Sequence, residues 1–196
     1  MKKKAIIIVA LAVAAVIALV WLVRTLSRAE VTIAANEEIN LTPEQITSIK
    51  ELGEWEFMAI ANEELVDTVR KSMLGDDHLV RIYYGTVRLG INMHQVGPGW
   101  IRTAGDSVEV VLPKIGLLDR DFIDEARTKS FFESGKWSHK DREALYQKAY
   151  RQMLRRSMTP ENINSARKNG EEQFRQMLRS MGYEHVSIQF EVSGEW

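Results

Sequence analysis

Four histidines are the first side chains in this sequence that could carry chemistry. His78, His94, His139 and His185 are spread along the chain, and no two of them are three or four positions apart. One helix face therefore cannot offer two of them to a metal ion. The sequence has no cysteine, which excludes disulfides, thiolate nucleophiles and cysteine-bound metals. We expect the protein to use neither a metal nor another cofactor.

Acidic residues cluster after Pro113, at Asp119, Asp121, Asp124 and Glu125. Two carboxylates at a controlled separation can catalyse glycoside hydrolysis. Acidic residues also gather at helix N-termini, where they cap free N–H groups and interact favourably with the helix dipole. We favour this structural interpretation, in which Asp119 or Asp121 caps a short helical turn that continues through Glu125.

Motifs of the common enzyme classes are absent from the sequence. It contains no GxSxG nucleophile motif and no Walker-type phosphate loop. Gly97-Pro98-Gly99, and the pair Gly85 and Gly90, lack the order of strand, glycine loop and helix that a dinucleotide site needs. The sequence therefore predicts that the protein is not an enzyme, and an unrecognised hydrolase stays open as an alternative.

Basic residues recur at helical spacing in two segments of the C-terminal half. Steps of three and four residues keep side chains on one side of a helix. Such a basic face is either simply solvated or contacts anionic lipid or an acidic protein surface. The residues of this possible interaction face are Lys148, Arg151, Arg155, Lys168, Arg175 and Arg179.

The charges of the chain are unevenly distributed. Residues 30–77 carry 3 basic and 12 acidic side chains, whereas residues 138–181 carry 10 basic and 5 acidic ones. This asymmetry predicts a polarised surface, which permits self-association or an acidic protein partner. The basic segments are too short and too interrupted for a nucleic-acid interface, so we expect no nucleic-acid partner.

Residues 5–23 predict a membrane-spanning helix. They form a run of 19 residues without a charge, and a helix of that length crosses a hydrocarbon core of about 30 Å. Three lysines precede the run and two arginines follow it. Positive charge concentrates on the cytoplasmic side of membrane proteins, so we expect a cytoplasmic N-terminus and a single pass, with the domain outside the cytoplasm.

A cleaved signal peptide is the alternative interpretation of this segment. Ser27-Arg28-Ala29 has the small-x-small pattern of a cleavage site. The apolar run is longer than the usual 7–15 residues of a signal peptide, and this length favours a retained anchor. The expected organisation is a Lys-rich start and anchor over 1–24, a connector with a short helix over 25–53, and a soluble domain over 54–196.

The first half of the domain is expected to contain mostly strands. Thr42-Pro43-Glu44-Gln45 is a helix-start pattern and predicts a helix over 43–52. Partial alternation then predicts a strand or hairpin arm over 54–70. Residues 79–93 are rich in β-branched and aromatic side chains, which predicts a strand whose Gly85 and Gly90 permit a bulge or a close backbone approach. Residues 100–112 predict a hairpin that turns at 104–106.

The second half of the domain is expected to contain two helices and a closing strand. Ser138 and Thr159 are predicted N-caps, for helices over 139–157 and from Pro160 to the residue before Gly182. Residues 126–133 fit a helix or a strand equally well, and residues 186–192 alternate as a strand. We therefore expect an α+β domain with one mainly antiparallel sheet and both long helices packed on one of its faces.

Three segments of this chain resemble the bacterial membrane-protein family called domain of unknown function 4230. They are Gly85-Thr86-Val87-Arg88-Leu89-Gly90-Ile91-Asn92, then Val110-Val111-Leu112-Pro113, then Leu178…Met181-Gly182-Tyr183…Val186-Ser187-Ile188-Gln189-Phe190. The resemblance covers most of residues 50–192. It implies an N-terminal hydrophobic helix, a β-rich stretch, two helices and a closing strand. It also implies a bacterial inner or plasma membrane, but no known activity and no catalytic residue.

These observations leave three expectations for function. The first is a non-enzymatic interaction or structural module that is anchored at the membrane and lies in the periplasm or outside the cell. The second is a ligand-binding or sensing domain of the envelope, which would need buried polar groups that converge in a pocket between sheet and helices. The third is the unrecognised hydrolase.

Overall fold

The computed structural model describes residues 41–73 and 75–191, which belong to one compact unit. The predicted anchor at 5–23, the cleavage pattern at 27–29 and the end of the last predicted strand at Val192 lie outside the described residues. Among the described helices, none is both long enough and apolar enough to cross a membrane.

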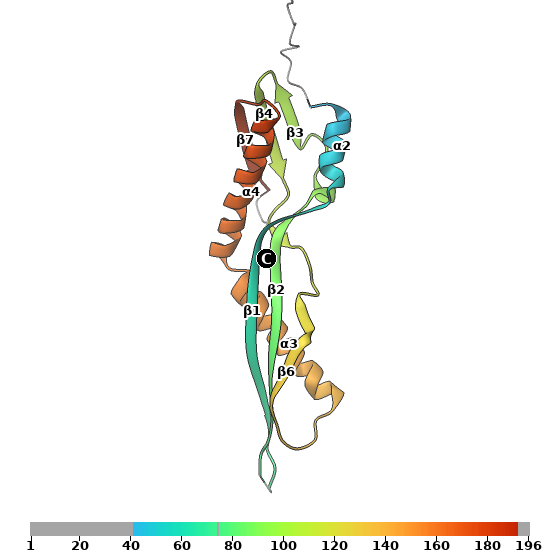
Figure 1. Cartoon of the computed structure of the whole chain (residues 1–196), viewed down its shortest axis with the longest axis vertical. Helices are drawn as coiled ribbons and strands as arrows, with labels where there is room; N and C mark the ends of the chain where they lie inside the picture. Colours follow the sequence, from blue (N-terminus) through green and yellow to red (C-terminus); the bar gives the residue numbers. More distant parts are fainter. Residues whose placement is uncertain (1–40, 74, 192–196) are drawn as a thin grey trace, which may run out of the picture. The chain divides into compact units, whose positions relative to one another are not determined.

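A long antiparallel ribbon dominates the first sheet (Figure 1). Strand β1 (Glu54–Arg70) pairs with β2 (Asp77–Asn92) along its whole length. On its other side β2 pairs with β5 (Gly116–Leu117) and β6 (Ile123–Glu133), both antiparallel. Strand β1 is therefore an edge strand of this sheet.

The second sheet contains three strands in the order β3-β4-β7. Strands β3 (Ile101–Ala104) and β4 (Ser107–Leu112) form the predicted hairpin. Strand β7 (His185–Phe190) pairs with β4 in parallel. The expectation of one mainly antiparallel sheet is thus wrong in part, because the described strands form two sheets. The parallel pair arises because a crossover with two helices carries the chain back before β7 starts.

The three described helices begin at the predicted caps. Helix α2 (Pro43–Glu51) and helix α3 (His139–Ser157) start with complete capping boxes, at Thr42 and Ser138. Helix α4 (Pro160–Ser180) starts at Thr159, whose side chain accepts the N–H of Asn162. A short 3₁₀ turn, η1 (Met93–Gln95), follows β2. The caps satisfy N–H groups that the first helical turn would otherwise leave free.

The two long helices pack their apolar stripes against the strands. On α3 the buried positions include Leu145, Ala149 and Met153, which follow one another at steps of four. Helix α3 lies along the β1–β2 ribbon, and α4 contacts both this ribbon and β7 (Figure 1). Helix α4 therefore joins the two sheets into one hydrophobic core.

Aromatic rings mark the point where α4 joins the sheets. The ring of Phe174 on α4 lies 4.6 Å from that of Trp55 and 6.3 Å from that of Phe57, both on β1. Phe57 also meets Phe190 of β7 edge-on at 6.3 Å. Both sheets thus contribute side chains to the same buried cluster.

The region after Pro113 differs from the sequence-based expectation. No helical turn forms at 119–125, and the chain is extended as β6 from Ile123, which settles residues 126–133 as strand. Main-chain pairing explains the difference, because the N–H of Thr86 on β2 donates to the carbonyl of Phe122 at 2.9 Å. Gly85 makes this approach possible, since a Cβ there would lie 2.7 Å from the same carbonyl oxygen. The predicted close approach at Gly85 is confirmed.

Candidate functional site

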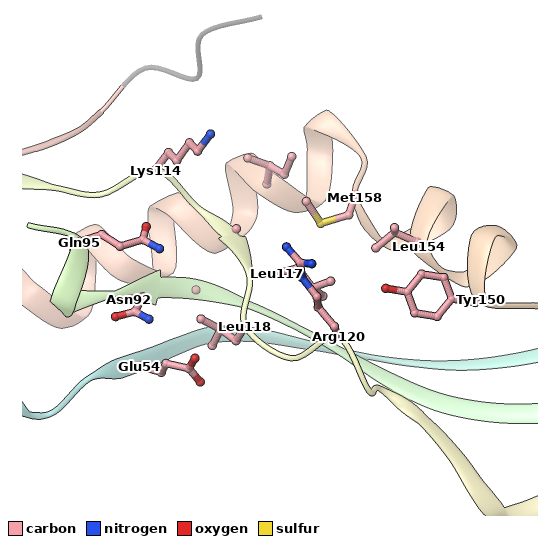
Figure 2. A pocket seen from close by; sticks show the side chains of 13 residues that line it. Glu54, Asn92, Gln95, Lys114, Leu117, Leu118, Arg120, Tyr150, Leu154 and Met158 are labelled. Atoms are coloured by element: carbon pink, nitrogen blue, oxygen red, sulfur yellow. The ribbon is translucent and has the colours of Figure 1, made fainter. Parts of the chain in front are cut away.

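A groove of about 690 Å³ lies between the β2–β5 side of the first sheet and the junction of α3 with α4 (Figure 2). This volume is within the range of about 300–1,000 Å³ that is usual for small-molecule sites. We call it the helix-junction groove. Its lining residues are Glu54, Gly90, Asn92, Gln95, Lys114, Gly116, Leu117, Leu118, Arg120, Tyr150, Leu154, Met158 and Ile163.

The helix side of the groove is apolar. Tyr150, Leu154 and Met158 follow one another at steps of four, so one face of α3 and its C-cap presents all three side chains. They pack against the hydrophobic core but stay only half-buried. The ring of Tyr150 is fixed by stacking on Phe122, with the ring centroids 4.6 Å apart. The groove wall is therefore a continuation of the core that reaches solvent.

The opposite side of the groove combines leucines with charged and amide groups. Arg120 extends its guanidinium into the groove (Figure 2). No ion pair or hydrogen bond of this side chain is found among the described residues. Glu54 lies at the β1 edge of the groove. A ligand with an apolar body and an anionic group would match the apolar wall and the projecting cation.

A second, smaller cavity of about 220 Å³ lies between β2, β6 and the first half of α3. We call it the polar pocket, because most of its lining side chains are polar or charged. They are Arg81, Tyr83, Glu125, Thr128, His139, Arg142, Glu143 and Tyr146. The strand and the helix bring together residues that are far apart in sequence, and sequence reasoning did not find this set.

Two signals for the polar pocket are nevertheless present in the sequence. Arg81 and Tyr83 alternate along β2, so both point to the face that α3 covers. An arginine on the covered face of a strand is unusual unless something pairs with it.

Burial raises the pKa of the Tyr83 hydroxyl, and the neighbouring Arg81 guanidinium offsets part of this rise. Burial also raises the pKa of the Tyr146 hydroxyl.

The acidic cluster after Pro113 has a structural role. Asp119 forms an ion pair with Arg88 at 2.9 Å and accepts the N–H of Asp121 at 2.8 Å. These two interactions lower the pKa of the Asp119 carboxyl, with the main-chain hydrogen bond as the larger cause. Asp124 accepts the N–H of Arg127 at 3.2 Å. The carboxylates therefore shape the turn into β6 and its first residues.

The family comparison matches the part of the chain that contains both cavities. The family described as "Protein of unknown function (DUF4230)" matches residues 47–188, which is more than half of the chain. The chain belongs to this family. The resemblance that the sequence motifs indicate is thereby confirmed. No curated protein and no solved structure matches the chain. Every lining residue of the two cavities falls inside the DUF4230 match.

The six basic residues predicted as an interaction face lie in different surroundings. Lys148 of α3 donates to the main-chain carbonyl of Asp67 on β1 at 2.9 Å, and its ammonium lies 3.3 Å from the Asp67 carboxylate. Arg175 of α4 is half-buried and donates to the carbonyl of Val186 at 2.8 Å. The other four are exposed, namely Arg151, Arg155, Lys168 and Arg179.

One group of three possible metal ligands comes together among the described residues. Asp106 of the β3–β4 turn lies beside Glu184 and His185 at the start of β7, with one ligand atom of each within 4.8 Å of the others. Sequence spacing does not reveal this group, because Asp106 is far in the chain from the consecutive residues Glu184 and His185. All three are exposed, and the His185 Nε2 lies 3.7 Å from the Asp106 carboxylate. Such a surface group can form an ion pair without any metal.

Proposed function

We propose that this DUF4230 protein is a membrane-tethered, non-enzymatic binding module of the bacterial envelope. In this proposal residues 5–23 anchor the chain, and the domain lies outside the cytoplasm. Its ligand is an amphiphile that places an apolar body against α3 and an anionic group on Arg120. The observation that carries the proposal is the helix-junction groove, where a cation projects beside a half-buried apolar wall.

The chemistry of the groove favours binding over catalysis. Leu154 and Met158 offer no group that takes part in acid–base or nucleophilic steps, and the ring of Tyr150 adds apolar surface to the same wall. Their exposed apolar surface would be removed from water by an apolar ligand, which contributes about 25 cal/mol per Å². Arg120 would add a charge-assisted hydrogen bond to an anionic group. A tether at the membrane would also keep the groove close to amphiphiles.

A matched pair of fluorescent probes tests the groove. The anionic probe 1-anilinonaphthalene-8-sulfonate and the neutral probe N-phenyl-1-naphthylamine share an apolar body, and only the first carries a sulfonate. The titrations use residues 38–196, which form a compact unit. We expect Arg120→Gln to weaken binding of the anionic probe about tenfold, or about 1.4 kcal/mol, and to leave the affinity for the neutral probe unchanged. We expect Leu154→Asn to weaken the binding of both probes.

Two control variants remove the same side-chain types elsewhere on the surface. Arg102→Gln removes an exposed arginine of β3, and Leu65→Asn removes an exposed leucine of β1. Neither residue lines the groove, so both controls should bind the probes like the unmodified protein. Equal probe affinities for Arg120→Gln, Arg102→Gln and the unmodified protein would contradict the proposal.

The location of the domain is tested separately. Alkaline phosphatase is active only outside the cytoplasm, so a fusion after Trp196 should be active in intact cells. Replacing the three lysines before residue 5 by glutamate should reduce this activity, because positive charge holds the N-terminus inside. Activity of a cytoplasmic reporter at the same position would reverse the proposed orientation. A mature chain that starts at Glu30 would instead identify a cleaved signal peptide.

A further inference from the structure

The first sheet has one face that points away from the helices. Helix α3 packs on the other face of the β1–β2 ribbon, where Leu79 and Tyr83 are buried (Figure 1). Side chains alternate along a strand, so Val80, Ile82 and Tyr84 project from the side opposite α3. We call the hairpin half of this side the outer sheet face. Register partners share a face, which gives its members as Glu63, Leu65, Asp67 and Val69 of β1, His78, Val80, Ile82 and Tyr84 of β2, and Asp124, Lys129 and Phe132 of β6.

The outer sheet face carries more apolar surface than a solvated sheet face usually does. An antiparallel sheet with one face in water normally places polar side chains there. Here the central strand presents Val80 and Ile82, and the flanking Leu65 and Phe132 are 55% and 52% exposed. Leu65 is the register partner of Ile82, and Phe132 is that of Val80, so the four side chains adjoin. Adjoining exposed apolar side chains of this kind mark interaction sites.

The two edges of the outer sheet face differ in charge. The β1 edge carries the acidic side chains of Glu63 and Asp67, and Asp67 is paired with Lys148 of α3 at 3.3 Å. The guanidinium of Arg127 lies over the Tyr84 ring and so belongs to the same face. The β6 edge therefore has one acidic and two basic side chains, namely Asp124, Arg127 and Lys129. The face thus has an acidic edge, an apolar centre and a mainly basic edge.

A twofold axis can pair two outer sheet faces in two ways. If the axis runs along β2, the β1 edge of each copy lies over the β6 edge of the other. Glu63 and Leu65 then meet the second copy's Arg127 and Lys129, and the symmetry repeats this contact at the opposite edge. If the axis runs across the strands, each β1 edge lies over its own counterpart, and Glu63 meets Glu63. Like charges that face each other cost affinity, so the charge pattern selects the axis along β2.

We propose that the outer sheet face pairs two copies of this chain that are anchored in one membrane. This inference rests on the anchor of the proposed function, but not on the ligand of the helix-junction groove. Rotation about an axis along β2 preserves the strand direction, so both copies enter β1 at Glu54 from the same end, as a shared membrane requires. The face mixes apolar with charged side chains, which is typical of interfaces that are not permanent. Anchoring raises the effective concentration, so the copies pair in the membrane and the free domain stays monomeric.

Cross-linking in lipid vesicles tests the pairing. The chain has no cysteine, so Thr86→Cys provides a single thiol, at an exposed position of β2 two residues from Tyr84 and on the same side of the sheet. The axis along β2 brings this thiol close to its counterpart. The full-length variant is reconstituted at a low ratio of protein to lipid and treated with a short bismaleimide. The matched control is Ser187→Cys, at an exposed position of β7 in the second sheet. We expect about tenfold more cross-linked dimer for Thr86→Cys than for Ser187→Cys.

Charge reversal in the Thr86→Cys background tests the arrangement. Glu63→Lys places an ammonium before the second copy's Arg127 and Lys129, and Lys129→Glu gathers carboxylates at the same contact. Each single variant should lower the cross-linked fraction about tenfold. The double variant with both changes restores opposite charges and should restore cross-linking. Glu109→Lys, at an exposed position of β4 in the second sheet, should have no effect. A double variant that cross-links no better than the single variants contradicts the axis along β2.

A second tether distinguishes a failed pairing from a failed anchor. Residues 38–196 with Thr86→Cys form the compact unit and are held on nickel-chelating vesicles by an N-terminal polyhistidine tag. Cross-linking of this tethered domain without cross-linking of the full chain would support the pairing and overturn the anchor. Absence of cross-linking in both preparations, or equal cross-linking of Thr86→Cys and Ser187→Cys, overturns the pairing.

Discussion

The Glu64 carboxylate of β1 lies 3.0 Å from the Arg156 guanidinium of α3. The glutamate side chain is only 5% exposed, whereas the arginine side chain is 69% exposed. A carboxylate that is removed from water needs a compensating charge or hydrogen bonds. Because Arg156 reaches this carboxylate from the surface, the pair fixes the end of α3 on the edge strand.

Replacing Arg156 should therefore destabilise the domain. Arg156→Met leaves the Glu64 carboxylate buried without its cation, and we expect a loss of about 1–3 kcal/mol in the free energy of unfolding. The loss stays below that of a fully buried pair because solvent screens the exposed arginine. Urea unfolding of residues 38–196 measures it. The matched control is Arg155→Met, which removes an exposed neighbour and should change stability by no more than about 0.5 kcal/mol.

A double variant identifies the cause of this loss. Glu64→Gln in the Arg156→Met background removes the stranded charge while keeping the side-chain shape, so part of the lost stability should return. If Arg156→Met and Arg155→Met cost the same, the ion pair contributes nothing and the burial of Glu64 must be compensated elsewhere.

Gly170 of α4 packs directly on Phe57 of β1. A Cβ at position 170 would lie 2.7 Å from Cε2 of the Phe57 ring. In an exposed helix Gly→Ala stabilises by about 1 kcal/mol. Here the contact reverses the sign, and we expect Gly170→Ala to destabilise the domain by about 1–3 kcal/mol. Urea unfolding measures the change. The cost should shrink in a Phe57→Leu background, whereas a more stable Gly170→Ala protein would refute the packing argument.

Local sequence signals predicted most of the secondary structure. The capping residues Thr42, Ser138 and Thr159 act on the nearest main-chain groups, so their effect can be predicted from a few neighbouring residues. The same holds for the strand over 54–70, although a bulge between Glu56 and Met58 interrupts its alternation, and for the turn between β3 and β4. These predictions are confirmed because the physics that produces them is local.

The predictions that failed depend on contacts between distant segments. Aspartate commonly caps helices, which is why the sequence predicts a helical turn after Asp119. Pairing of β6 with β2 instead makes the chain extended from Ile123. The division into two sheets depends on where α4 returns the chain to β4. The polar pocket likewise forms only when Arg81 and Tyr83 of β2 face α3. Alternation along the sequence places Arg81 and Tyr83 on one face of β2, but no local pattern shows which helix covers that face.

Asp141 makes the start of α3 sensitive to acid. Its carboxylate accepts the hydroxyl of Ser138 at 2.7 Å and the Ser138 N–H at 2.9 Å, and it forms an ion pair with Arg70 at 2.9 Å. The pKa of Asp141 is lowered, first by the Ser138 hydroxyl, then by the Ser138 N–H, and also by Arg70. A lowered folded-state pKa means that the stabilisation is complete above the unfolded value of about 3.9 and disappears as pH falls through the folded value.

Unfolding at two pH values tests this dependence. Asp141→Asn should cost more stability near pH 7 than near pH 2, because at low pH the unmodified carboxyl is protonated as well. Chemical unfolding of residues 38–196 measures the difference at each pH. Glu51→Gln is the control, since Glu51 is an exposed carboxylate at the end of α2 and its cost should not vary in this way. A cost of Asp141→Asn that is independent of pH would contradict the cap argument.

The last prediction concerns self-association through the basic side chains of α3, namely Lys148, Arg151 and Arg155. The acidic segment 30–77 is the natural target for this row in a neighbouring copy. Within one chain, however, Lys148 already pairs with Asp67 of that segment, and Arg156 already pairs with Glu64. Intramolecular pairing leaves fewer acidic groups for a second copy. We therefore expect Arg151 and Arg155 to form a solvated face rather than a dimer contact.

Charge reversal and salt distinguish these outcomes. Arg151→Glu and Arg155→Glu should each change the free energy of unfolding by no more than about 0.5 kcal/mol. Lys148→Glu should cost more, up to about 1 kcal/mol, because it places a carboxylate beside Asp67. Sedimentation of residues 38–196 should give a monomer at both low and high salt. A dimer that forms at low salt, dissociates at high salt and is lost in the Arg151→Glu, Arg155→Glu double variant would instead establish electrostatic self-association, because salt screens exposed charge pairs.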